Sequence, residues 1–281
     1  MEAARPSKTA LRVALRRAAH QVYDARPLVF EDLLAVRILG AEYAGDLKRT
    51  ETRLAKPFSV ALRAFLVARS RYAEDCLEAA YARGVRQYCL LGAGLDTFGY
   101  RNGYEGLRVF EVDHPATQAW KRGLLDRNGI AVPASLRFVA VDFECQGLEE
   151  RLVPAGFDLR APAFFAWLGV VPYLTLEAFR GTLEFIAGRA AGSGVVMDYG
   201  QPREVLPELE RMGHDSLASR VALAGEPFRL FFTPEEMRAE LAGFEAVEDL
   251  GAGELNGRYF AERVDGLRIR GAAGRVSCAW V

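Results

Sequence analysis

The first part of the chain shows the spacing of apolar residues that is typical of helices. Apolar side chains recur every three or four positions over 10–23, 30–39 and 57–81, which predicts one helix over each range. Gly84 follows the last range and is typical of a residue that ends a helix. The pattern therefore predicts a helical N-terminal cap over residues 1–84.

From Val85 onward, short apolar runs alternate with longer helical stretches. Five runs predict strands over 85–91, 108–113, 136–142, 163–168 and 194–198, with helices over 116–127 and 175–190. Such an alternation predicts a mostly parallel α/β sheet covered by helices on both faces. Two late runs, 244–250 and 275–281, predict final strands that could form an antiparallel pair at one edge, after a helical insertion over 199–240. We expect residues 85–281 and the cap to form one structural unit.

The charge balance excludes several classes of partner. The chain has 281 residues and a net charge of -1, with 36 Lys and Arg against 37 Asp and Glu. Nucleic acids and anionic membranes bind basic faces, so we expect neither as a partner. The basic run Arg12, Arg16 and Arg17 has the spacing of the solvated face of a helix.

The cysteine and histidine usage indicates no metal centre and no disulfide framework. The four cysteines lie far apart without a C-x-x-C pair, and the chain has only three histidines. A reduced cytoplasmic setting fits this usage. The N-terminus lacks a signal-peptide core, and the most apolar stretch, 163–176, is too short to span a bilayer. We expect a soluble protein, either a monomer or a homodimer.

Candidate ligand-binding residues follow the first three predicted strands. Gly92, Ala93 and Gly94 follow the first, where glycines let the backbone pass close to a ligand. Asp113 ends the second strand, 19 residues after Gly94, which is the place of an acid that binds ribose hydroxyls. Asp142 and Phe143 end the third strand, where they could face an adenine. Together the strand ends favour a nucleoside cofactor.

The turn itself distinguishes between two nucleoside cofactors. A dinucleotide site uses G-x-G-x-x-G, whereas the third glycine position here is Thr97, and Asp96 places negative charge where a pyrophosphate would bind. S-adenosylmethionine carries cations and one carboxylate but no phosphate, so the turn favours it over NAD. Two alternatives stay open from the residues alone. One is an NAD(P)-dependent reductase, and the other is a protein that binds the cofactor without turnover.

Several motifs in order resemble the leucine carboxyl methyltransferase family, and more narrowly its bacterial S-adenosylmethionine-dependent O-methyltransferases. They are LGAGLDTFGYR at 91–101, VFEVDHPATQ at 109–118 with Trp120 and Lys121, RPLVF at 26–30, ARSRY at 68–72, VDF at 141–143 and WLGVVPYL at 167–174. The match runs from about residue 18 to 200, with a weaker echo in RYF at 258–260. The resemblance implies a class I methyltransferase fold, with a seven-stranded sheet, an N-terminal helical cap and a helical insertion before the last two strands.

The resemblance also assigns cofactor contacts to particular residues. It implies that Arg69 holds the cofactor carboxylate, that the Gly92–Gly94 turn approaches the methionyl part, and that Asp113 binds the ribose. His114 belongs to the same set and also shapes the turn into the next helix, while Asp142 and Phe143 would hold the adenine. The eukaryotic members have a Glu where this chain has Leu168, which we expect to pack against the cofactor. This difference weakens the inference that the chain acts on the phosphatase substrate of the eukaryotic members.

The acceptor is expected to be a small metabolite, such as a polyketide-type acid or a phenol of secondary metabolism. A carboxylate is already ionised at pH 7 and needs no base, whereas a hydroxyl acceptor needs one. His214 and Tyr173 are the candidates for a catalytic role. Tyr173 and Tyr199 follow the fourth and fifth strands and could line the acceptor pocket, and Arg26 could attract an anionic acceptor.

Overall fold

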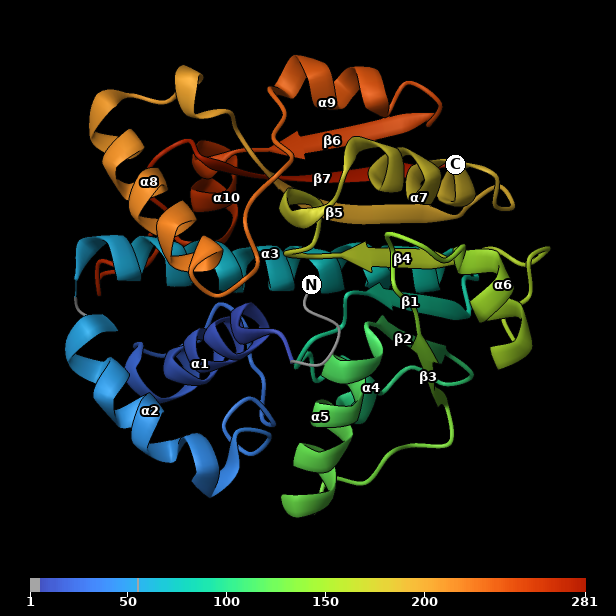
Figure 1. Ribbon diagram of the computed structural model, residues 1–281, viewed down its shortest axis with the longest axis horizontal. Helices are drawn as coiled ribbons and strands as arrows, with labels where there is room; N and C mark the ends of the chain where they lie inside the picture. The colour runs from blue at the N-terminus through green and yellow to red at the C-terminus, as the bar shows by residue number, and fades with distance from the viewer. Residues whose placement is uncertain (1–5, 55) are drawn as a thin grey trace.

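A single mixed sheet organises the molecule (Figure 1). The computed structural model describes residues 6–54 and 56–281. The strands are β1 (Gln87–Leu91), β2 (Arg108–Asp113), β3 (Leu136–Ala140), β4 (Phe164–Trp167), β5 (Gly194–Gly200), β6 (Ala246–Leu250) and β7 (Gly274–Trp280). Their order is β3-β2-β1-β4-β5-β7-β6, with β7 antiparallel to both neighbours. The predicted seven-stranded, mostly parallel sheet is confirmed, including the antiparallel pair at one edge.

Helices cover both faces of this sheet. The helices are α1 (Lys8–Tyr23), α2 (Gly40–Leu54), α3 (Pro57–Ala82), α4 (Phe98–Arg101), α5 (Pro115–Arg127), α6 (Leu148–Leu152), α7 (Leu176–Ala187), α8 (Glu208–Ala222), α9 (Pro234–Glu240) and α10 (Ala252–Tyr259). All of β1 is buried, with Tyr88 and Leu90 packing toward α3 and α10, and Cys89 and Leu91 packing toward α6, α7 and α9. Strands that are buried on both faces explain the near-continuous apolar runs in the sequence.

The long helix α3 links the N-terminal region to the sheet. It contacts α1 and α2 on one side and β4, β5 and β7 on the other (Figure 1). Its residues belong to the same buried cluster as β1 and β4. No helix in the described part of the chain is both long enough and apolar enough to cross a membrane.

One predicted helix is wrong. Residues 30–31 are irregular, residues 32–39 form successive turns, held by bonds such as Ile38 N to Leu34 O at 2.8 Å, and the next helix, α2, begins at Gly40. Phe30, Ile38 and Leu39 are buried nonetheless. The spacing of these apolar residues therefore predicted correctly that they are buried, but it did not predict that they lie in turns. The sequence prediction missed α2 because residues 40–54 include few large apolar side chains, although those present, such as Tyr43 and Leu47, have helical spacing.

The predicted insertion between β5 and β6 is only partly helical. β5 extends to Gly200, α8 follows, and residues 223–233 run without regular structure to α9. α9 packs on the sheet through Met237. Figure 1 shows α8 beyond the carboxyl ends of the strands, beside the start of α3.

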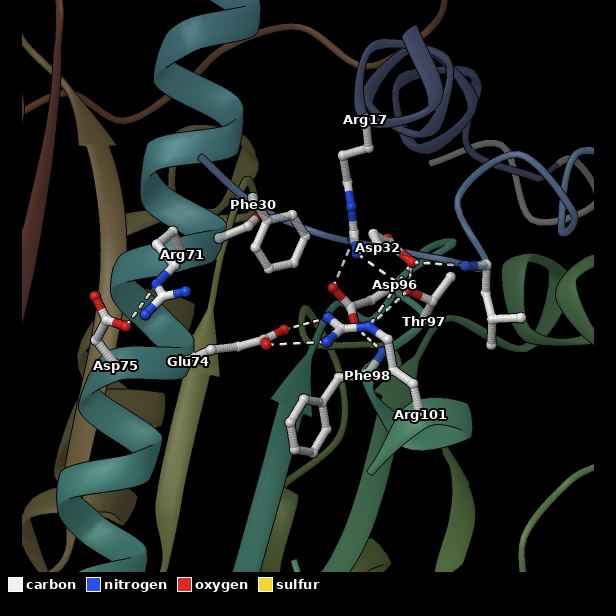
Figure 2. A network of polar contacts seen from close by, with 12 residues as sticks. Arg17, Phe30, Asp32, Arg71, Glu74, Asp75, Asp96, Thr97, Phe98 and Arg101 are labelled. Atoms are coloured by element: carbon white, nitrogen blue, oxygen red, sulfur yellow. Dashed lines mark hydrogen bonds and ion pairs between the residues drawn. The ribbon is translucent and has the colours of Figure 1, made fainter. Parts of the chain in front are cut away.

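A buried ionic network joins α1 to the loop after β1 (Figure 2). The guanidinium of Arg17 donates to Asp96 at 2.7 Å and to Asp32 at 2.6 Å. Thr97 Oγ1 also donates to Asp32, at 2.7 Å. Arg17 is only 5% exposed, so its interpretation as part of a solvated helix face is wrong. We call Arg17, Asp32, Glu74, Asp96, Thr97 and Arg101 the Arg17 network.

The other half of the network reaches α3. Arg101 donates through two nitrogens to the carboxylate of Glu74. The Phe30 ring lies beside both arginines, with its centroid 5.3 Å from the Arg17 guanidinium and 5.1 Å from that of Arg101. Three separate segments, α1, the 30–39 turns and α3, are thereby fixed against the loop that follows β1.

The network makes stability depend on the ionisation of Asp96. Burial by itself would raise the pKa of Asp96, but the guanidiniums of Arg17 and Arg101 outweigh burial and lower the pKa to about 2. An acid with a lowered pKa stabilises the fold above its unfolded pKa, and this contribution is lost as pH falls through the folded pKa. The contribution amounts to about 2 kcal/mol at neutral pH.

We therefore expect Asp96→Asn to lower the free energy of unfolding at pH 7 by about 2 kcal/mol or more, because the change also leaves Arg17 with one carboxylate fewer. The difference from the unmodified protein should shrink between about pH 4 and pH 2. Urea denaturation across this range measures it, with the exposed Asp126→Asn as the control. A difference that stays constant with pH would contradict the role of Asp96.

Candidate cofactor and acceptor site

A cavity of about 240 Å³ opens at the carboxyl ends of β1 to β4. Its floor comes from the residues that follow these strands, and its walls come from α1, α3 and the segment 225–229. Ten of the predicted site residues line it: Arg69, Gly92, Ala93, Gly94, Asp113, His114, Asp142, Phe143, Leu168 and Tyr173. Parallel strands bring these residues together because their carboxyl ends share one edge of the sheet.

The glycine turn brings three segments into close contact. Gly92 and Gly94 have φ values of +67° and +50°, which other residues adopt only with strain. A Cβ on Gly92 would lie 2.2 Å from the Val170 side chain, and one on Gly94 would lie 3.2 Å from Ala10 Cβ. The glycines thus serve packing against the β4 loop and α1 in addition to leaving room in the cavity.

Asp113 lies at the end of β2, facing the turn. Its two carboxylate oxygens accept hydrogen bonds from Gly94 N at 2.5 Å and from His114 N at 2.7 Å. Burial raises the pKa of Asp113 in spite of these two bonds. The carboxylate is therefore oriented by the backbone of the glycine turn and still lines the cavity.

Arg69 reaches the cavity from the middle of α3 and is 6% exposed. One of its terminal nitrogens donates to Asp198, whose other oxygen accepts from Gly169 N at 2.5 Å. Its Nε is buried without a hydrogen-bond partner. A buried donor without a partner is costly, so Arg69 has unused capacity for an anionic group in the cavity. Asp198 fixes the guanidinium against the loop after β4.

The other end of the cavity carries the residues predicted for adenine. Asp142 and Phe143 follow β3, and Phe143 packs on the core beneath it. His114 caps α5, with Nδ1 accepting from Ala116 N at 3.2 Å, so it shapes the helix start and also lines the cavity. At this end of the cavity, Nη1 of Arg229 lies 3.7 Å from Oε2 of Glu144.

The start of α1 closes the side next to Tyr173. Thr9 N donates to Glu226 at 3.0 Å, and Thr9 Oγ1 donates to the same carboxylate. Burial raises the pKa of Tyr173 to about 12, although its hydrogen bond with Thr9 acts in the opposite direction. Tyr173 is therefore a neutral hydroxyl at physiological pH.

Three predicted site residues lie outside the cavity. Successive side chains along β5 point to opposite faces of the sheet, so the side chain of Tyr199 points away from the cavity. It is buried, and its hydroxyl donates to Asp249 at 3.1 Å. His214 lies on α8 against the Phe231 ring, at a centroid distance of 5.4 Å. Arg26 is exposed and lies 3.5 Å from Glu31. None of these three side chains therefore lies with the ten predicted residues that line the cavity.

Sequence reasoning missed three features of the cavity. Asp198 lies near the end of β5, so the rule that singled out Asp113 and Asp142 could have found it. Arg17 lines the cavity from α1, and its carboxylate partners lie too far along the sequence for helical spacing to reveal them. Thr9 and Glu226 are 217 residues apart, and no local pattern links them. Among the described residues, no group of three or more His, Cys, Asp or Glu side chains is placed to hold a metal ion.

Known proteins share both the sequence pattern and the fold. The leucine carboxyl methyltransferase family matches residues 10–187. A Bacillus subtilis (strain 168) protein named "Putative S-adenosyl-L-methionine-dependent methyltransferase YktD" is 30% identical over 93% of each chain. A DUF574 family protein from Streptomyces avermitilis MA-4680 superposes with a TM-score of 0.58, at 20% identity and 96% coverage of each chain.

A second solved structure has the same fold. It is titled "putative methyltransferase" from Thermobifida fusca YX, and it superposes with a TM-score of 0.61 at 19% identity, covering 98% of this chain and 95% of the other. The family match covers the helix α1, the glycine turn and the first three strand ends, which together form most of the cavity. The chain belongs to the leucine carboxyl methyltransferase family.

Proposed function

We propose that this S-adenosylmethionine-dependent methyltransferase is an O-methyltransferase that acts on a small-molecule carboxylate or hydroxyl. The methyl-donor class follows from the family and from its near-full-length relative. The oxygen acceptor, the small size of the substrate and a role in secondary metabolism are our proposal. The four cysteines are free thiols, in keeping with the reducing cytoplasm that we propose as its setting.

The observation that supports binding of the methyl donor is the presence of Arg69 and the strand-end acids in one cavity. Arg69 offers a buried, unsatisfied Nε for the cofactor carboxylate. Asp113, oriented by two backbone N–H groups, would accept from the ribose, and Asp142 with Phe143 would hold the adenine. The turn at Gly92, Ala93 and Gly94 leaves space beside the methionyl part, next to His114 and Leu168. These residues fit S-adenosylmethionine, which when bound supplies an activated methyl group on its sulfonium.

The chain's own residues would position an acceptor and exclude water. α1, held by Thr9 to Glu226, covers the side of the cavity beside Tyr173. Methyl transfer needs alignment of the acceptor oxygen more than it needs proton transfer. A carboxylate acceptor requires no base, and Tyr173, with its raised pKa, is suited to donate a hydrogen bond rather than to remove a proton. The cavity therefore favours an ionised acid over a phenol.

Asp113→Ala should weaken the binding of S-adenosylhomocysteine by roughly 1.5–3 kcal/mol, which is about 10-fold to 150-fold, because a charged acceptor for the ribose is lost. Isothermal titration calorimetry measures this change. Asp126→Ala, at an exposed position of α5, is the control and should leave the affinity unchanged. Unchanged affinity in Asp113→Ala would remove Asp113 from the cofactor site.

Arg69→Lys should weaken S-adenosylhomocysteine about 10-fold or more but leave 5′-methylthioadenosine unaffected, because only the first ligand carries the amino-acid carboxylate. Lysine retains a positive charge opposite Asp198, so the variant should fold. Asp113→Ala, by comparison, should weaken both ligands. An equal loss for both ligands in Arg69→Lys would contradict a carboxylate-binding role.

The acceptor class can be read from the stability of the product. We expect the methyl label of S-adenosylmethionine to reach a small organic acid in a panel of acids and phenols, and mild alkali to release it as methanol from a methyl ester. Label that resists alkali on a phenol would indicate an ether and a hydroxyl acceptor. Transfer to nitrogen or carbon, with no oxygen product, would contradict the proposal.

A further inference from the structure

Glu226 lines the cavity with a carboxylate that is only half used. Its Oε2 accepts from Thr9 N at 3.0 Å and from Thr9 Oγ1. Among the described residues, no side chain or backbone group donates to its Oε1, and no Lys, Arg or His forms an ion pair with it. A carboxylate oxygen can only accept hydrogen bonds. Glu226 therefore presents a negative charge and an available acceptor atom at the cavity wall.

The fold puts Glu226 on the side of the cavity that the proposed cofactor contacts leave open. The residues proposed for the adenine, the ribose and the methionyl part follow β3, β2 and β1, and β4 is the next strand in the sheet. Glu226 lies beside the loop after β4, since it shares Thr9 as a bonding partner with Tyr173. In the same segment, Arg229 N donates to Pro172 O at 2.7 Å. An acceptor next to the methionyl part would therefore bind beside Glu226.

The charged residues of the cavity lining are predominantly acidic. Each lining arginine already faces a carboxylate, Arg17 in the network described above, Arg69 at Asp198 and Arg229 at Glu144. S-adenosylmethionine brings two positive charges and one negative charge, so it offsets only part of the acidic excess. An acceptor that is purely anionic would be repelled by Glu226, whereas a cationic group would be attracted. The lining acids and arginines are Asp96, Asp113, Asp142, Glu144 and Glu226 against Arg17, Arg69 and Arg229.

We propose that Glu226 binds a protonated amino group of the methyl acceptor, and that the acceptor is therefore an amino acid or a related zwitterion. This inference rests on the proposed small-molecule O-methyltransferase function and narrows its acceptor class. An ammonium group is a donor without acceptor capacity, and its bond to a carboxylate is charge-assisted. Glu226 Oε1 would accept this bond while Oε2 continues to hold Thr9.

The two charged groups of such an acceptor have separate roles. In the proposed transfer, a carboxylate oxygen of the acceptor bonds to the methyl carbon, the carbon–sulfur bond breaks, and its electron pair stays on the sulfur. The products are a methyl ester and S-adenosylhomocysteine, and no proton is released, so the reaction needs no base. Glu226 would hold the ammonium end and thereby orient the carboxylate end toward the methyl group. We therefore assign Glu226 to acceptor specificity rather than to proton transfer.

Calorimetry with the full chain tests the proposal. The protein amino acids, β-alanine and γ-aminobutyrate are titrated with and without S-adenosylhomocysteine, each beside its deamino analogue, such as leucine beside isocaproate. We expect at least one amino acid to bind at least 10-fold more tightly than its analogue. In Glu226→Gln this ratio should fall to about 1, because the amide oxygen can still accept from Thr9 but the charge is lost. The exposed Glu262→Gln is the control and should keep the ratio.

A second variant separates the charge of Glu226 from its contact with α1. Thr9→Val removes the hydroxyl bond but leaves the carboxylate and the backbone bond, so it should keep the amino-acid preference. Thermal unfolding of each variant controls for folding. A loss of preference in Thr9→Val as large as in Glu226→Gln would assign the effect to the placement of the segment and overturn the inference.

S-adenosylhomocysteine separates this inference from the proposed function. Its affinity should be unchanged in Glu226→Gln. If the unmodified protein does not bind it, the proposed function fails, and the amino-acid titrations without it still decide the inference. Weaker binding of S-adenosylhomocysteine but not of 5′-methylthioadenosine in Glu226→Gln would place the carboxylate at the amino group of the cofactor, which overturns the inference. The inference is also overturned if the unmodified protein prefers no amino acid to its analogue, or if Glu226→Gln keeps the preference.

Discussion

The placement of α1 over the cavity depends on one buried guanidinium. Arg17 holds two carboxylates from different segments, Asp32 in the turns before α2 and Asp96 in the loop after β1. A buried charge is tolerated only when it is paired and hydrogen-bonded, so neither segment can move away without exposing Arg17 to a large desolvation cost. The cavity wall, the glycine turn and the N-terminal turns therefore form one ionic unit, to which α3 adds Glu74 through Arg101.

The same principle organises the cofactor side. Asp198 forms an ion pair with Arg69, and the backbone N–H groups of Gly94 and His114 donate to Asp113. Each charged group is oriented before any ligand arrives, and each retains some capacity for a further contact. Preorganisation of this kind reduces the entropy that ligand binding has to offset.

The sequence predicted the strands and the strand-end residues well because both follow local rules. Parallel strands buried on both faces leave apolar runs, and Asp113 and Asp142 end two of these runs. Residues 30–39 show where local rules fail. Their apolar spacing predicted a helix, whereas the buried side chains there belong to a segment of turns. Tyr199 and His214 show another limit, because the direction of a side chain depends on strand register and on helix placement. Pairs such as Arg17 with Asp96 are fixed by tertiary contacts that no short window of sequence contains.

The contact between Gly92 and Val170 has a consequence for altering specificity by design. A side chain on Gly92 would collide with Val170, so the loop after β1 and the loop after β4 are mechanically coupled. Substitution of Val170, which lines the cavity, would therefore also disturb the glycine turn that we propose to face the cofactor. The segment 225–227 lines the same cavity from a different wall and has no such contact with Gly92. If the cavity holds cofactor and acceptor as we propose, the segment 225–227 is the part of its wall that can be changed with least effect on the glycine turn.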